Sequence, residues 1–117
     1  MKDDKERLRD ILEAIGRIEK HAARGHAVLE TDELVQVWMV HHLQVIGEAA
    51  RRLSDDLRGR HPEIPWPQII AMRNILVHDY FAVDLEEVWS AVERDLPDLK
   101  KKITAILDEL GPAEPEP

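Results

Sequence analysis

Residues 31–57 read TDELVQVWMVHHLQVIGEAARRLSDDL, and this stretch decides the fold. Its dense apolar residues predict a long helix, with Thr31 or Asp32 as the N-cap. The apolar residues cover most of the helix circumference, so the helix is either central or buries a second face against a partner chain. We favour the partner chain, because a domain of four or five helices of this size would leave part of that surface uncovered. The stretch therefore predicts a homodimer.

The flanking segments predict further helices on both sides. Apolar residues recur at helical spacing over residues 3–24, and Gly25 is a plausible stop. Three prolines exclude helix from the loop at 59–67, where Pro67 suits the first residue of a third helix that runs toward residues 78–81.

A fourth helix is expected to start at Asp84, which forms a capping box with Glu87. Pro97 should kink or restart this helix, and it should end near Gly111. No segment alternates with the two-residue period of a strand. The sequence predicts an all-α, up-and-down bundle of four to five helices over residues 1–110, followed by a flexible polar tail at 111–117.

Composition limits the kind of protein this is. The chain has 117 residues and no cysteine, which fits one domain and excludes a disulfide scaffold or a thiolate metal site. The charged start does not resemble a signal peptide, and no apolar run is long enough for a membrane span. We therefore expect a cytoplasmic protein with no membrane partner.

The net charge of −8 is unfavourable for general nucleic-acid binding, because phosphate binding needs positive charge. The charges are unevenly distributed along the chain, however. Residues 51–78 hold five arginines against three acidic residues, so this stretch is +2 and the remainder is −10. Arg51, Arg52, Arg58 and Arg60 are either a solvated helix end or, as we slightly favour, contacts along an RNA backbone.

One polar group breaks the apolar pattern of the third helix. Arg73, Asn74, His78 and Tyr80 crowd its end. On a regular helix Arg73 and His78 would point roughly 140° apart. They would converge only if the helix loosens or if a second subunit supplies one of them, which is a further reason to expect a dimer. The simpler interpretation is an Arg–Asp pair that caps the helix, with His78 and Tyr80 packing against it.

These residue types suffice for RNA cleavage without a metal. Histidine can transfer a proton near neutral pH, and arginine can bind a phosphate and stabilise charge that develops on phosphorus. Asparagine can orient the imidazole or a substrate oxygen. The attacking group would be the ribose 2′-hydroxyl.

The pattern Arg73-x4-His78-x-Tyr80, with Asn74 after the arginine, resembles the signature of HepT-like proteins in the HEPN superfamily. The likeness extends to other segments, in order along roughly residues 5–110: Ile46–Arg51, His61–Trp66, Met72–Phe81, Val83–Trp89 and Asp95–Pro97.

This resemblance implies a homodimeric toxin of a toxin–antitoxin pair, a ribonuclease whose composite site uses the arginine and histidine of both subunits. It implies an MNT-type nucleotidyltransferase antitoxin that transfers AMP from ATP to Tyr80, so ATP serves the partner and this chain needs no cofactor. The alternative is a non-catalytic, dimeric helical module that partners the nucleotidyltransferase.

Other residues have less specific interpretations. Gly47 and Glu48 indicate either close helix packing or a dimer seam with Glu48 near the active cleft, and these remain equally open. We interpret Trp38, Trp66 and Trp89 as core residues rather than platforms for bases. His21, His26, His41 and His42 show no ligand spacing for zinc, so no metal is expected.

Overall fold

A computed structural model describes residues 3–74 and 84–111, and these form helices and turns without a strand. The helices are α1 (Asp4–Ala22), α2 (His26–Thr31), α3 (Glu33–Arg51), α4 (Asp55–Arg60), α5 (Trp66–Ala71), α6 (Leu85–Ser90), the π-helical segment η1 (Ala91–Asp95) and α7 (Leu96–Leu110). The predicted tail beyond residue 111 and the predicted continuation into residues 75–83 lie outside the described residues.

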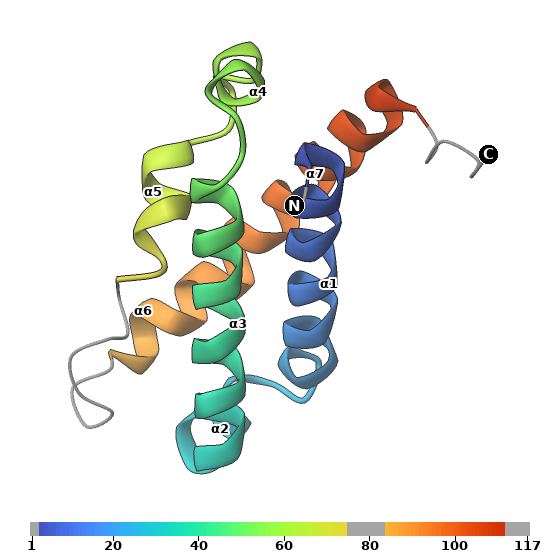
Figure 1. The fold of residues 1–117 in the computed structure, drawn as a ribbon. Coiled ribbons are helices and arrows are strands. Elements are labelled where there is room, and N and C mark those ends of the chain that lie inside the picture. Colours follow the sequence, from blue (N-terminus) through green and yellow to red (C-terminus); the bar gives the residue numbers. More distant parts are fainter. Residues whose placement is uncertain (1–2, 75–83, 112–117) are drawn as a thin grey trace.

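The helices form an up-and-down bundle with α3 at its centre (Figure 1). α1 and α5 pack on α3, and α6, η1 and α7 form one continuous arm that crosses α3 and α1. The short helices α2 and α4 lie at opposite ends of α3. The described residues thus confirm the predicted all-α bundle, built on α1, α3 and the arm of α6, η1 and α7 with short helices between them.

Local capping explains where most helices begin. The carboxylates of Asp3, Asp32 and Asp84 each accept hydrogen bonds from backbone N–H groups in the first turn of α1, α3 and α6. Such bonds satisfy donors that have no partner within the helix. The predicted caps at Asp32 and Asp84 are confirmed.

The predicted helix over 31–57 is wrong at its C-terminal end. α3 ends at Arg51, and Ser54 then accepts a hydrogen bond from the N–H of Leu57 as the N-cap of α4. Ser54 also donates to Asp4, which ties this break to the start of α1. The chain turns here because the serine offers a second helix start.

The region around the prolines differs slightly from the prediction. α4 continues to Arg60, so only residues 61–65 separate it from α5, and Pro67 lies in the first turn rather than at the first residue. Near the other end, η1 ends at Asp95, and Pro97 lies in the first turn of α7, which follows directly. A proline lacks the N–H that an α-helical turn would need, and the wider turn accommodates this loss. The regular α-helix is therefore interrupted near Pro97, as predicted.

The chain itself covers most of α3. The side chains of Val35, Met39, Leu43 and Ile46 are buried, and among the large apolar residues described only Leu34 and Val37 are exposed, at 81% and 41%. One chain thus leaves part of this helix uncovered, as expected, but the uncovered apolar part is small. Dimerisation stays a prediction. The exposed apolar surface of α3 that could serve it is limited to Leu34 and Val37, near the N-terminal end of the helix.

Candidate functional site

The predicted arginine, Arg73, lies where the chain leaves α5 and passes close to α3. The N–H groups of Met72, Arg73 and Asn74 donate to carbonyls three residues earlier, so the helix tightens into i to i−3 turns. The regular helix assumed for Arg73 and His78 therefore does not hold at Arg73. His78 and Tyr80 lie outside the described residues.

Gly47 makes this close approach possible. A Cβ atom at position 47 would lie 2.6 Å from the backbone nitrogen of Arg73 and 3.1 Å from the carbonyl oxygen of Ile70. Both are backbone atoms, so any side chain would force the two segments apart. The packing interpretation of Gly47 is confirmed, and it fixes the position of Arg73 as well.

Three arginines surround one carboxylate at this contact. Glu48 Oε1 accepts hydrogen bonds from Arg51 Nη2 at 2.9 Å and from Arg52 Nε at 2.8 Å. Arg73 Nε lies 3.6 Å from Glu48 Oε2. We call Glu48, Arg51, Arg52 and Arg73 the arginine cluster. The cluster contains three guanidinium groups and one carboxylate, so it has a formal excess of positive charge.

The electrostatics of the cluster keep Glu48 ionised. Hydrogen bonds from Arg51 and Arg52, with a further contribution from the charge of Arg73, lower the pKa of Glu48 to about 2. The Arg73 side chain remains 40% exposed, so its guanidinium is held at the surface and stays accessible to a ligand. The arrangement can bind an anion such as a phosphate group.

The other two predicted RNA contacts lie on α4 and are paired there. Arg58 Nη2 lies 2.5 Å from Asp55 Oδ1, and Arg60 Nη2 lies 3.2 Å from Asp56 Oδ2. Each partner is an acidic residue of the same short helix. The structure thus divides the basic stretch of the sequence into an arginine cluster and a neutralised pair of arginines.

Asn74 is exposed beside Arg73, and its backbone N–H donates to the carbonyl of Ala71 at 2.9 Å. Arg73 and Asn74 directly precede the residues that carry His78 and Tyr80. Of the predicted catalytic residues, the structure therefore places the first two next to each other on the surface.

Two surface hollows flank these elements. One, of about 370 Å³, lies between α5 and the α6–α7 arm and contains none of the predicted site residues. The other is shallower, lies between α1 and α3, and is lined by Arg7, His41, Gln44 and Glu48 among others. The second hollow extends the polar surface of the arginine cluster toward α1.

Of the three tryptophans predicted as core residues, Trp66 is buried, Trp89 is partly buried against the core, and Trp38 is half-buried. The indole N–H of Trp66 donates to the carbonyls of Arg58 and His61, and that of Trp38 donates to the carbonyl of Arg17. Trp89 stacks on His26. Each of the three rings therefore has a contact within the fold.

The histidines of the chain have different surroundings. His42 is buried against Trp38, and burial, assisted by the neighbouring His41, lowers the pKa of His42. His26 is different, because it meets Glu30 and Glu86 in space. Sequence reasoning missed this group because it expected no helix over residues 26–31 and examined histidine pairs only. The sequence did contain a signal for this group: His26 and Glu30 follow Gly25 and are four residues apart, so they share one face if the segment is helical.

None of the helices within residues 3–74 and 84–111 combines the length and apolar content that crossing a membrane would require. An all-α bundle that holds an arginine and an asparagine at the start of an Arg-x4-His motif defines the HEPN class of helical domains. The profile of the family described as "Ribonuclease HepT-like" matches residues 11–106. The chain therefore belongs to the HepT-like ribonuclease family, which confirms the resemblance that the motif indicated.

Individual relatives agree with this assignment. "Probable ribonuclease HepT" of Thermococcus cleftensis is 38% identical over 99 residues, which is 84% of this chain and 90% of that protein. "Gamma-glutamylcyclotransferase and putative RNase MJ0434" of Methanocaldococcus jannaschii is 36% identical over 110 residues, which is 93% of this chain but 50% of that protein. "Putative RNase MJ1380" of the same organism is 33% identical over 75 residues, 64% of this chain and 69% of that protein. No solved structure matches the chain significantly.

Proposed function

We propose that this protein is a metal-independent endoribonuclease that acts as the toxin of a toxin–antitoxin pair. The observation that carries the proposal is the contact at Gly47, which holds Arg73 beside Arg51 and Arg52 at the start of the Arg73-x4-His78 motif. Membership of a ribonuclease family and the names of the relatives support the same activity.

In the proposed reaction, the ribose 2′-hydroxyl attacks the adjacent phosphorus and the 5′-oxygen of the next nucleotide leaves. His78 moves the proton, as general base toward the 2′-hydroxyl or as general acid toward the leaving oxygen. Arg73 stabilises the charge on the pentacoordinate phosphorus, and Asn74 orients the imidazole or a substrate oxygen. The products are a 2′,3′-cyclic phosphate and a 5′-hydroxyl, and no metal takes part in the step.

Arg51 and Arg52 have the proposed role of binding neighbouring phosphates of the RNA. Both are about half exposed and share one carboxylate with Arg73, so positive charge remains available to a ligand. Arg58 and Arg60 contribute less in this proposal, because Asp55 and Asp56 already pair with them.

The proposed active form is a homodimer in which the arginine and histidine of both subunits form one composite site. The exposed Leu34 and Val37 are the apolar residues of α3 available for such an interface. Sedimentation should show a dimer at micromolar concentration, and a stable 13.5 kDa monomer would contradict the composite site.

Regulation is proposed to act through Tyr80. An MNT-type nucleotidyltransferase would transfer AMP from ATP to the tyrosine hydroxyl with release of pyrophosphate. The added phosphate is an anion two residues from His78, and pairing with Arg73 would keep it in the place of the RNA phosphate. Intact mass after co-expression with a nucleotidyltransferase should rise by whole AMP units in the parent chain and not in Tyr80→Phe.

The test of the activity is cleavage of single-stranded RNA by the purified full chain in EDTA. We expect cleavage by the parent and its loss in His78→Ala, with His26→Ala, a histidine of the separate helix α2, as the matched control. Cleavage that persists in His78→Ala would show a contaminating nuclease or a different catalytic group. A parent chain that binds the nucleotidyltransferase but never cleaves RNA would favour the alternative, a non-catalytic interaction module.

A further inference from the structure

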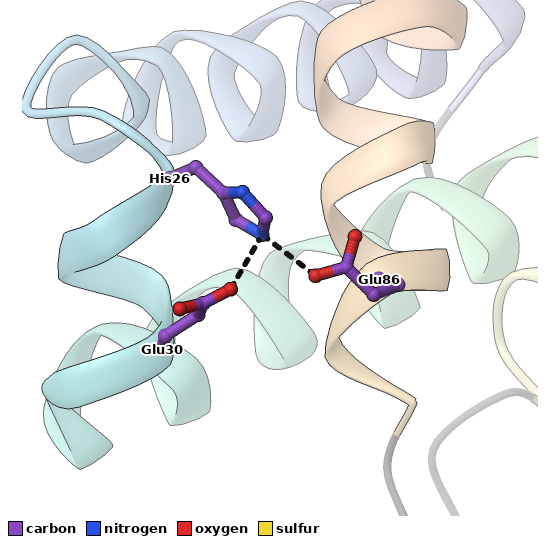
Figure 2. A group of neighbouring side chains, drawn as sticks. All are labelled: His26, Glu30 and Glu86. Atoms are coloured by element: carbon purple, nitrogen blue, oxygen red, sulfur yellow. Dashed lines mark ion pairs between the residues drawn. The ribbon is translucent and has the colours of Figure 1, made fainter.

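Three side chains from separate turns of the bundle meet near the end of α3 that is remote from α4. His26 begins α2, Glu30 lies one turn later on the same helix, and Glu86 lies in the first turn of α6 (Figure 2). His26 Nε2 is 3.2 Å from Glu30 Oε1 and 3.0 Å from Glu86 Oε1. One ligand atom from each of the three residues lies within 4.8 Å of the other two.

Each of these side chains has its own structural support. Gly25, at a φ of 98°, lets the chain turn into α2 so that His26 and Glu30 share one face. The indole of Trp89 stacks on the His26 ring with centroids 5.1 Å apart, which restricts the plane of the imidazole. The Asp84 carboxylate accepts a hydrogen bond from the N–H of Glu86 and so fixes the start of α6.

The end of α2 is held as well. Gln36 Nε2 donates to the carbonyl of Leu29 at 2.9 Å, from one turn into α3. Trp89 follows Glu86 by three residues on α6, so one helix supplies both a carboxylate and the ring that orients the histidine. A ligand set supported in this way is more preorganised than surface carboxylates on loops.

The two distances from the histidine nitrogen to the carboxylate oxygens fit a first-row metal ion. Zinc binds histidine nitrogen and carboxylate oxygen at roughly 2.0–2.1 Å, and two such ligands of a tetrahedral ion are then about 3.3 Å apart. The nitrogen–oxygen distances of 3.2 and 3.0 Å are close to that value. The imidazole nitrogen favours zinc over magnesium and calcium, which prefer oxygen ligands.

The state of His26 Nε2 is a second and independent observation. The His26 side chain is 35% exposed, but within the described residues its Nε2 atom is shielded from solvent and makes no aligned hydrogen bond, although carboxylate oxygens lie 3.0 and 3.2 Å from it. The nitrogen is thus directed at a small region between two negative charges and is not aligned with either oxygen. A cation bound there would satisfy the nitrogen and offset the repulsion between the carboxylates.

We propose that His26, Glu30 and Glu86 bind one Zn²⁺ ion that joins α2 to α6. Water would complete the coordination, because both glutamates are more than half exposed. These ligands belong to α2 and α6, whereas the arginine cluster belongs to α3 and the end of α5, so the ion would stabilise the bundle and take no part in the proposed cleavage. The inference does not depend on the ribonuclease proposal.

Zinc binding by the full chain tests the inference directly. Protein freed of metal with a chelator and then dialysed would be titrated with zinc sulfate by calorimetry, and its Tm measured with and without zinc. The informative variant is Glu86→Gln, which keeps the size of the side chain and removes its charge. The matched control is Glu87→Gln, the next exposed residue of the same helix.

We expect the parent and Glu87→Gln to bind one zinc ion and to gain Tm with zinc, since an ion that binds only the folded state stabilises it. Glu86→Gln should bind at least about tenfold more weakly and lose the gain in Tm, because one of three protein ligands is missing. His26→Ala should behave like Glu86→Gln, with His41→Ala as its control. Magnesium should produce no gain in any of these proteins.

Two results would overturn the inference. One is a parent chain that neither binds zinc at this stoichiometry nor gains Tm, which would mean that the three residues form only a histidine–carboxylate ion pair. The other is zinc binding by Glu86→Gln and His26→Ala that equals that of the parent, which would place the ion elsewhere in the chain.

Discussion

The arginine cluster and the helix α4 come from one basic stretch of sequence, yet the fold gives their arginines different surroundings. Arg51 and Arg52 are joined by Arg73, which lies just beyond the end of α5, and the three share Glu48. Arg58 and Arg60 each face an acidic residue of their own helix. Charge along a sequence therefore does not show where charge accumulates on the surface. The long-range contact at Gly47 makes the difference.

The largest expected effect is on the rate of RNA cleavage, which should depend on Arg73 far more than on Arg58. Arg73→Ala should lower kcat/KM for RNA cleavage by roughly 10²–10³-fold, the range seen when a group that stabilises transition-state charge is removed. Arg58→Ala should have little effect, because Asp55 already pairs with that guanidinium. Single-turnover cleavage assays on both variants measure this, and equal losses would mean that the two regions act alike.

The next largest effect is on the stability of the fold, compared between a variant of Gly47 and a control variant of Gly16. Gly47→Ala should destabilise the fold by about 1–3 kcal/mol, because its Cβ would meet the backbone of Arg73. Gly16 lies within α1 with no atom within 4 Å of an added Cβ, so Gly16→Ala should stabilise the fold by up to about 1 kcal/mol.

Urea denaturation of the two glycine variants gives the comparison. Cleavage should also fall in Gly47→Ala, even at temperatures where the variant is folded, because Arg73 would be displaced. A variant as stable and as active as the parent would show that the close contact is not needed to position Arg73.

A smaller effect is expected in the salt dependence of RNA binding. Arg51→Ala and Arg52→Ala should each reduce the slope of log K against log salt by about 0.7, the contribution of one phosphate contact on a single strand. Arg60→Ala should leave the slope unchanged. Fluorescence anisotropy with a 2′-O-methyl RNA, which resists cleavage, would measure this, and a larger change in Arg60→Ala would reverse the proposed assignment.

The smallest expected effect is on the stability of the fold at acid pH. The pKa of Glu48 is lowered from 4.5 to about 2 in the folded state, so its carboxylate stabilises the fold above pH 4.5 and this contribution is lost as the pH falls toward 2. Glu48→Gln lacks this contribution at every pH. The parent should therefore lose more stability than the variant between pH 5 and 2, by a modest amount, because the ion pairs are more than one third exposed.

Urea midpoints across that pH range, at low and high salt, test the role of Glu48. Salt should reduce the difference between the parent and Glu48→Gln. Parallel pH profiles would indicate that the arginine cluster contributes nothing to folding and acts only as a binding surface.

The sequence alone determined the class of fold, several helix starts and the family. Asp32 and Asp84 cap their helices as predicted, because an N-cap depends on bonds within four residues. Apolar periodicity located α1 for the same reason, since one face of a helix is set by local spacing. The Arg73-x4-His78 motif indicated the family without any knowledge of distances.

Only the tertiary structure decided which charges meet. The bonds between Ser54 and Asp4, fifty residues apart in sequence, tie the break after α3 to the start of α1. The contact of Gly47 with Arg73 and the convergence of His26 with Glu86 likewise join segments whose separation no local pattern encodes. Such contacts follow from how the helices pack, and packing is decided by the whole core at once.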